Sequence, residues 1–193
     1  KAIHRANRML FTIKSDLLGN YQQHNIRTVL AAIEILSLTT SFQLPIERAI
    51  EALAHVKQLT GLRGRWDVLQ THPLIVTDVA HNAAGVQEVF SQWNAINATT
   101  KHIVVGFVKD KDVTKALTHF PKEAVYYFCQ ANIPRALPSH ELFQLASTLG
   151  FNGVAFSSVA TAVAAAQSAM KHDDALLITG SFFIVNEAME VIA

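Results

Sequence analysis

The chain is short of cysteine, of net charge and of long apolar runs, and each shortage removes a class of protein. Its single cysteine, Cys129, excludes an internal disulfide and favours a reducing compartment, so we expect a cytoplasmic location. The 16 lysine and arginine residues nearly balance the 15 aspartate and glutamate residues, and no basic stripe indicates nucleic-acid binding. The longest run of small apolar residues, 159–170, is too short to span a bilayer. We therefore expect neither nucleic acid nor a membrane as a partner.

Several motifs that indicate nucleotide binding, metal binding or hydrolase activity are also absent. The sequence contains no GxGxxG or GxxxxGK[ST] pattern, so the chain offers no phosphate loop that could hold a nucleotide by itself. It contains no HxxxH or CxxC pattern, and we expect no metal site formed by this chain alone. The absence of GxSxG weakens the hypothesis of a self-contained hydrolase that uses Asp78 and His81. The first residue is Lys1, which favours a fragment of a longer protein.

What the chain does contain begins with a mainly helical piece, residues 1–60. Apolar residues recur at helical spacing over 25–38, and Pro45 opens a second amphipathic helix. A short strand is expected at 10–13. Residues 60–65 include two glycines, break the helical pattern and predict a linker.

The second piece, residues 61–193, alternates apolar strands with amphipathic helices. This alternation is typical of a mostly parallel sheet that is covered by helices on both faces. The sequence therefore predicts an α/β, Rossmann-like fold preceded by the helical segment. The expected strands are 66–70, 74–78, 102–107, 124–129, 154–156 and 175–179. The expected helices are 85–96, 111–120, 139–149 and 158–170, and 183–192 is expected to be helical or extended.

Polar residues gather where these strands end. One strand stops at Asp78, and His81 follows across the turn into a helix. The last strand closes on Gly180-Ser181, and Arg65 precedes the first strand. Ligands bind at the carboxyl ends of the strands in open α/β sheets. We therefore expect His81 and Ser181 to lie at one edge of the sheet and to share a site.

Each of these residues also has a purely structural interpretation. Asp78 could simply end its strand while Asn82 caps the following helix. Arg65 could be a solvated linker charge, although a guanidinium suits the paired oxygens of phosphate or carboxylate. Gly180-Ser181 is a common pair of turn residues, so by itself it only weakly indicates a ligand-binding site. The spacing leaves both interpretations open.

Taken together, these residues resemble the Mur ligase superfamily, and within it folylpolyglutamate synthase and the bifunctional dihydrofolate synthases. The motifs occur in the family's order along nearly the whole chain, with Val79 at a position where the family has a glycine. The matching segments are Leu18-Gly19-Asn20-Tyr21-Gln22 with Asn25, Gly64-Arg65, Asp78-Val79-Ala80-His81-Asn82, Gly106 with Asp110-Lys111-Asp112, Arg135-Ala136 and Thr179-Gly180-Ser181.

The resemblance implies a domain organisation, an activity and a set of site residues. Residues 1–60 would be the helical tail of a central ATPase domain, and 61–193 the carboxyl-terminal Rossmann-like ligase domain. ATP would phosphorylate a folate carboxylate, and the amine of L-glutamate would attack the acyl phosphate. By this resemblance the ATP-binding residues are Asn25, Arg65 and Asp78, the glutamate-binding residues are His81 and Ser181, and the catalytic residue is His81.

The same resemblance places part of the site outside this sequence. The family's phosphate loop, magnesium ligands and modified lysine belong to a region that would precede Lys1, in the amino-terminal ATPase domain. The expected partners are then ATP, L-glutamate, a folate and that domain, with magnesium as cofactor. This chain alone is expected to be inactive. A non-catalytic α/β module that binds a small anion is the alternative function.

Overall fold

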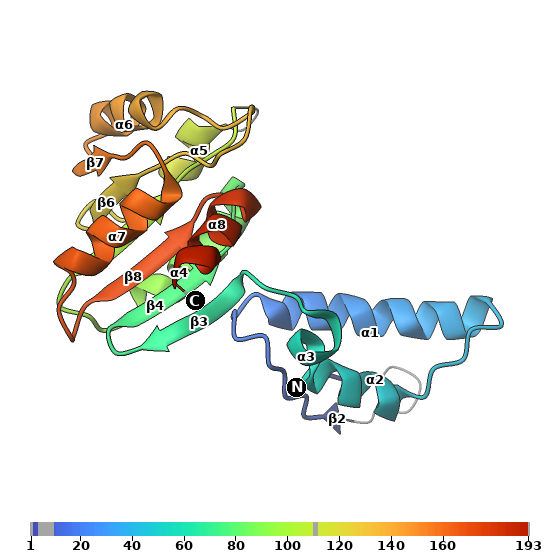
Figure 1. Cartoon of the computed structure of the whole chain (residues 1–193). Coiled ribbons are helices and arrows are strands. Elements are labelled where there is room, and N and C mark those ends of the chain that lie inside the picture. The colour runs from blue at the N-terminus through green and yellow to red at the C-terminus, as the bar shows by residue number, and fades with distance from the viewer. Residues whose placement is uncertain (1, 4–9, 110–111, 193) are drawn as a thin grey trace. The chain divides into compact units, whose positions relative to one another are not determined.

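The chain folds into two compact units, Lys1–Arg63 and Gly64–Ala193 (Figure 1). The computed structural model describes residues 2–3, 10–109 and 112–192. In these ranges no helix is both long and apolar enough to cross a membrane.

In the first unit, the described residues form three helices and a two-stranded antiparallel sheet. Both predicted helices are present, and the second follows Pro45 as expected. This second helix ends at Ala54, and His55 separates it from a short third helix. The strands are β1, Ala2–Ile3, and β2, Leu10–Phe11; the helices are α1, Gln22–Thr39, α2, Ile46–Ala54, and α3, Val56–Thr60.

The second unit is built on a six-stranded sheet with the strand order β3-β4-β8-β5-β6-β7. All neighbouring strands are parallel except β3 and β4, which are antiparallel. The last strand of the chain, β8, thus lies inside the sheet between β4 and β5. The strands are β3, Arg65–Thr71, β4, Leu74–Asp78, β5, Lys101–Val105, β6, Val125–Phe128, β7, Gly153–Ala155, and β8, Ala175–Thr179.

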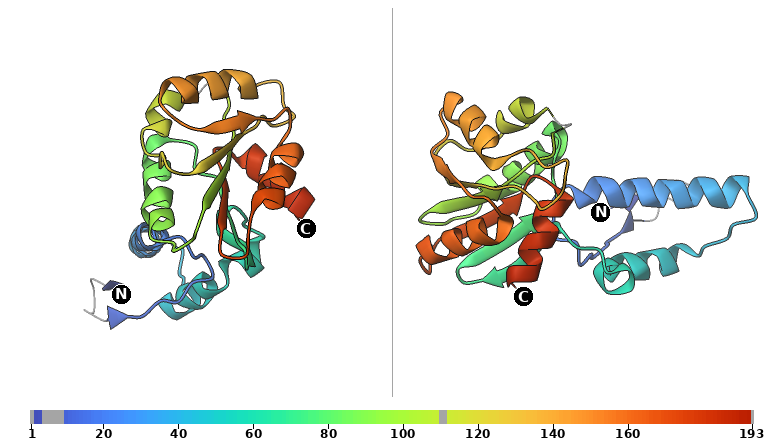
Figure 2. Two further views of the ribbon diagram at one scale, coloured as in Figure 1. Left: turned by 90° about the vertical axis from the view of Figure 1, so that its left-hand side faces the viewer. Right: turned by 45° about the horizontal axis from the view of Figure 1, so that its top comes forward.

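Helices cover both faces of this sheet, so the predicted mostly parallel α/β fold is confirmed. On one face α7 and α8 contribute Val163 and Ile184 to a core that includes Ile75 and Val104 from the strands. On the other face lie α4 and α5 (Figure 2). The helices are α4, Ala83–Asn94, α5, Val113–Leu117, α6, Ser139–Thr148, α7, Val159–Ala169, and α8, Phe182–Ile192.

The start of the sheet differs from the sequence prediction. Arg65, expected in the linker, is the first residue of β3. Only His72 and Pro73 separate β3 from β4, and a connection this short allows an antiparallel hairpin but no parallel crossover. At the other end of the chain, the undecided segment 183–192 belongs to a helix, α8.

At the amino edge of the sheet, the buried Asp174 carboxylate ties neighbouring segments together. It accepts the N–H of Thr100 at 2.9 Å and that of Lys171 at 2.7 Å, and His102 Nε2 lies 3.6 Å away. Burial by itself raises the pKa of Asp174. The two backbone N–H groups and His102 outweigh burial and hold this pKa below the ordinary aspartate value. The charged carboxylate therefore stabilises the fold.

We expect Asp174→Asn to lower the free energy of unfolding by about 1.5–3 kcal/mol at neutral pH, because the amide sets a donor against a backbone donor. A lowered folded-state pKa gives stability that is complete above the unfolded-state pKa of about 3.9. It is lost as the pH falls through the folded-state pKa. The mutant should therefore lose less stability than the wild type when the pH falls below about 4.

Urea unfolding at neutral and acid pH measures this difference. Asp173→Asn is the matched control, since its side chain is 79% exposed, and it should unfold like the wild type at each pH. An equal effect of the two substitutions would contradict the stabilising role of Asp174.

Candidate functional site at the carboxyl edge of the sheet

The carboxyl edge of the sheet brings together segments that are far apart in the sequence. β4 and β8 are parallel neighbours, so both end at this edge. The Gly180 N–H donates to the Ala80 carbonyl oxygen at 3.1 Å, and Thr179 Oγ1 donates to the same oxygen at 3.4 Å. The expectation that the segments carrying His81 and Ser181 meet at one edge is confirmed.

Backbone approaches backbone so closely at this edge that side chains are excluded. Gly180 has a φ of +106°, and a Cβ built on it would overlap the Gly106 carbonyl oxygen. A Cβ on Gly106 would lie 2.5 Å from the Cys129 carbonyl oxygen.

The Cys129 side chain is buried in the core beside this contact. Burial, with a smaller contribution from Glu187, raises the pKa of its thiol, so the thiol is unreactive.

The turn that leads into β3 is held by two buried carboxylates. The Gly64 N–H donates to Asp67 Oδ2 at 2.5 Å, and the Trp66 N–H donates to Asp78 Oδ2 at 2.9 Å. The other oxygen of Asp78 accepts the Ala80 N–H at 2.9 Å. Asp67 and Asp78 are 3% and 2% exposed, so both act from inside the fold. Asp78 therefore ends β4 and also anchors the neighbouring turn.

Arg65 opens β3 at this same edge, because antiparallel pairing places it opposite Asp78. Its side chain is half-buried, and Nη1 lies 3.4 Å from the Gly64 carbonyl oxygen. No carboxylate among the described residues forms an ion pair with it. The guanidinium thus keeps most of its donors for an anion at the edge of the sheet.

His81 lies between the end of β4 and the start of α4. It is half-buried, and its Nδ1 is 3.0 Å from the Val79 carbonyl oxygen, a contact that leaves Nε2 for a ligand. Asn82 is the helix cap that the structural interpretation predicts, since its Oδ1 accepts the Gly85 N–H at 2.9 Å. The helix is thus capped by the amide, and His81 is not used for that purpose.

Ser181 lies between β8 and α8 and is 5% exposed. Its Oγ accepts the Ile184 N–H at 3.2 Å, which caps the helix. The hydroxyl hydrogen remains able to donate to an acceptor at the edge of the sheet. Ser181 therefore caps α8 and keeps its hydroxyl hydrogen for a second hydrogen bond.

Other residues of the resemblance belong to the first unit, cap another helix, or lie outside the described residues. Asn25 belongs to the first unit, where it is exposed on α1 and its amide donates to Gln22 Oε1 at 2.9 Å. Asp110 and Lys111 lie outside the described residues. Asp112 caps α5, since its Oδ1 accepts the Lys115 N–H at 3.0 Å.

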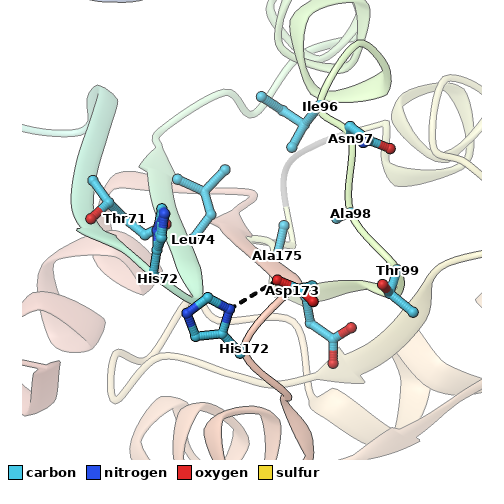
Figure 3. A pocket seen from close by; sticks show the side chains of 11 residues that line it. Thr71, His72, Leu74, Ile96, Asn97, Ala98, Thr99, His172, Asp173 and Ala175 are labelled. Carbon is cyan, nitrogen blue, oxygen red and sulfur yellow. Dashed lines mark hydrogen bonds and ion pairs between the residues drawn. The ribbon is translucent and has the colours of Figure 1, made fainter.

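A separate hollow of about 440 Å³ lies at the opposite, amino edge of the sheet (Figure 3). The rings of His72 and His172 meet edge to face there with centroids 5.4 Å apart, and His172 Nδ1 is 2.9 Å from Asp173 Oδ1. It is lined where β3 ends, where β4 and β8 begin and by the segment before β5, so this hollow is not the predicted site. In the part of the chain that the structure describes, no group of three or more His, Cys, Asp or Glu side chains could hold a metal ion.

Comparison with known families identifies the domain that carries the carboxyl edge. Residues 64–182 match the family described as Mur ligase, glutamate ligase domain. The match covers more than half of the chain and contains Arg65, Asp78, His81 and Ser181. The chain belongs to the Mur ligase family.

Known relatives of this Mur ligase chain are considerably longer than it is. Dihydrofolate synthase/folylpolyglutamate synthase of Escherichia coli strain K12 is 30% identical over 184 residues, which are 94% of this chain and 40% of that protein. E. coli FolC in complex with DHPP and ADP has a TM-score of 0.74 at 25% identity and matches 96% of this chain and 41% of that one. A bifunctional folylpolyglutamate synthase/dihydrofolate synthase with Mn, AMPPNP and L-glutamate bound has a TM-score of 0.77 at 25% identity and matches 97% and 43%. The chain thus spans about two fifths of these relatives.

Two residues that shape the Arg65 turn of this Mur ligase domain were not predicted from the sequence. Asp67 has a sequence signal, because an acid three residues after a glycine is well placed to accept a backbone N–H. Trp66 has none: its φ of +56° is left-handed, a conformation in which a bulky side chain is rare. The strain becomes visible only in the folded chain.

The close backbone packing predicts that alanine substitutions at two glycines of this Mur ligase domain will lower the free energy of unfolding by very different amounts. Gly180→Ala should lower the free energy of unfolding by about 2–5 kcal/mol, because backbone strain adds to a clash with the Gly106 carbonyl. Gly150 is the matched control: its φ is +82°, but a Cβ there would meet nothing within 4 Å. Gly150→Ala should cost only about 1–2 kcal/mol. Denaturant unfolding compares the two, and equal losses would show that the contact with Gly106 is unimportant.

Proposed function

We propose that this chain supplies the carboxyl-terminal part of an ATP-dependent ligase that adds L-glutamate to a folate. The observation that carries the proposal is the meeting of Arg65, His81 and Ser181 at the carboxyl edge of a Mur ligase domain. Support comes from relatives named dihydrofolate synthase/folylpolyglutamate synthase, and from related structures that hold ADP, or AMPPNP with Mn and L-glutamate. The enzyme would act in the cytoplasm, in keeping with the single buried cysteine.

The proposed reaction has two steps. ATP transfers its terminal phosphoryl group to a folate carboxylate, which gives an acyl phosphate and ADP. The amine of L-glutamate attacks the acyl carbon, and the tetrahedral intermediate collapses to an amide and phosphate. Because no bond to the protein forms, the residues of this chain contribute through positioning and charge.

Each residue of the carboxyl edge has a proposed role in these steps. Arg65 contacts the phosphates of ATP, where its charge offsets that of the transferred group. Ser181 donates its hydroxyl to a glutamate carboxylate, and His81 Nε2 orients the amine or carboxylate of the same substrate. His81 thus acts on the reacting group and is the proposed catalytic residue.

Asn25 and Asp78 complete the proposed ATP contacts in different ways. Asn25 is exposed on α1 and carries a free amide edge that suits a nucleotide base or sugar. Asp78 is buried, and both of its oxygens already accept backbone N–H groups. Its contribution to ATP binding is therefore expected to come chiefly through the position of the Arg65 turn.

The rest of the proposed ligase would supply the phosphate loop and the magnesium ligands. The described residues offer no three-ligand group for a metal ion, so no step is assigned here to magnesium. Residues 1–60 would be the tail of the ATPase domain that holds these parts. In keeping with this, Ile35 and Leu38 of α1 are 59% and 79% exposed, which leaves apolar surface for a covering domain.

We expect the 193-residue chain alone to show no ligase activity, because ATP lacks a backbone cradle for its phosphates. The test supplies ATP, magnesium, a reduced folate and L-glutamate, and measures phosphate release together with the mass of the folate product. The full-length protein that contains these residues is the positive control and should extend the folate by glutamate. Turnover by the isolated chain would refute this expectation, and no glutamylated product from the full-length protein would refute the proposed function.

In the full-length protein, Arg65→Ala should impair the use of ATP, and His81→Ala should impair the use of glutamate. Loss of one charge-assisted contact costs about 1.5–3 kcal/mol, so Arg65→Ala should raise KM for ATP roughly 10- to 150-fold. His81→Ala should raise KM for glutamate, lower kcat, or both, with little change for ATP. Steady-state kinetics with each substrate varied in turn separates these effects.

A matched arginine tests whether the effect belongs to the site. Arg48 is exposed on α2 and pairs with Glu51 at 3.3 Å, so Arg48→Ala should leave both KM values unchanged. If Arg65→Ala has the same kinetics as the wild type, Arg65 is a solvated surface charge and not an ATP contact. If His81→Ala impairs only the use of ATP, His81 contacts the nucleotide and not glutamate.

A further inference from the structure

The residue that follows Arg65 has an unusual backbone conformation. Trp66 has a φ of +56° although it is a bulky residue, and it is 3% exposed. Left-handed backbone costs about 1–2 kcal/mol for such a residue and persists only where the surroundings enforce it. Gly64, on the other side of Arg65, is also left-handed, with a φ of +70°. Arg65 is therefore held between two left-handed residues.

Hydrogen bonds to buried groups enforce this conformation on both sides of Arg65. Asp67 Oδ2 accepts the Gly64 N–H, and Asp78 Oδ2 accepts the Trp66 N–H at 2.9 Å. The Gly64 carbonyl oxygen in turn accepts the Val79 N–H at 3.0 Å. The turn is thus fixed to the end of β4 by its donors and by its acceptor.

Packing against two valines also excludes a side chain at Gly64. A Cβ built on Gly64 would lie 2.6 Å from Val79 Cγ1 and 3.2 Å from Val185 Cγ1. The same Gly64 carbonyl oxygen lies 3.4 Å from Arg65 Nη1, so the guanidinium rests against the turn. A change in the backbone conformation of Gly64 therefore moves the carbonyl oxygen that supports the guanidinium and also the backbone that carries Arg65.

We propose that Asp67 is a positioning residue that sets the Arg65 guanidinium toward ATP. This inference rests on the proposed function, in which Arg65 contacts the phosphates. Asp67 does not touch the nucleotide; its carboxylate holds the Gly64 N–H and so the backbone conformation of Gly64, which orients Arg65. Removing the carboxylate leaves the buried Gly64 N–H without its acceptor, and the backbone before Arg65 shifts to recover a partner. Small displacements of a positioning group reduce catalysis strongly, so the effect should appear in ATP use.

The test measures steady-state kinetics of the full-length ligase with substitutions at Asp67. Asp67→Ala should raise KM for ATP about tenfold and leave KM for glutamate unchanged. Asp67→Asn keeps an acceptor oxygen in the same place and should stay within about threefold of the wild type. If the alanine variant does not fold, Asp67→Glu replaces it: its carboxylate is longer by one methylene, misses the Gly64 N–H and should also raise KM for ATP.

A double-mutant cycle distinguishes positioning from a general loss of structure. If Asp67 acts through Arg65, adding Asp67→Ala to Arg65→Ala should not raise KM for ATP further. Asp174→Asn is the structural control, since Asp174 is also a buried carboxylate that accepts backbone N–H groups, but at the opposite edge. It should lower stability without an effect specific to ATP.

The outcomes separate this inference from the proposed function. An active wild type in which substitutions at Asp67 leave KM for ATP unchanged, or in which the two penalties add, would overturn the positioning role alone. Equal effects on ATP and glutamate, as a partly unfolded enzyme would give, would also overturn it. A wild type that forms no glutamylated folate from ATP and glutamate would refute the proposed function, and this inference with it.

Discussion

The structure of the second unit depends on the insertion of β8 between β4 and β5. This strand comes from near the end of the chain, yet all five of its residues are buried at the centre of the sheet. Its parallel pairing on both sides brings the ends of three strands to one edge. The glycines at that edge, Gly106 and Gly180, let the strand ends pack backbone against backbone. Without β8, the segments that carry His81 and Ser181 would have no common edge.

The two edges of this sheet use buried carboxylates for different purposes. At the amino edge, Asp174 accepts backbone N–H groups from Thr100 and Lys171, and its lowered pKa reflects a contribution to stability. At the carboxyl edge, Asp67 and Asp78 hold a turn whose backbone is strained. Strain of this kind is retained where surrounding contacts over-determine the chain, and such places are often functional. The carboxyl edge is thus the place where a rigid fold can hold charged groups for a ligand.

The candidate site could be predicted from the sequence only in part. Asp78, His81 and Ser181 follow apolar strands, and the rule that ligands bind at the carboxyl ends of parallel strands locates them without a structure. Asp67 lies within a strand, and its spacing from Gly64 is a local signal for a backbone hydrogen bond but not for a ligand site. The burial of Asp78 also depends on the neighbouring strand, because its partner, the Trp66 N–H, is supplied by the hairpin.

The sequence by itself determined the α/β class, the sheet covered on both faces and the order of helices and strands, because continuous apolar strands and amphipathic helices are local patterns. It also determined the resemblance to the Mur ligases, since the motifs occur in order along the chain. Only the tertiary structure decided that β8 is central and that Trp66 is left-handed. Strand order and backbone strain result from contacts between distant segments, and local apolar patterns do not encode which segments will meet.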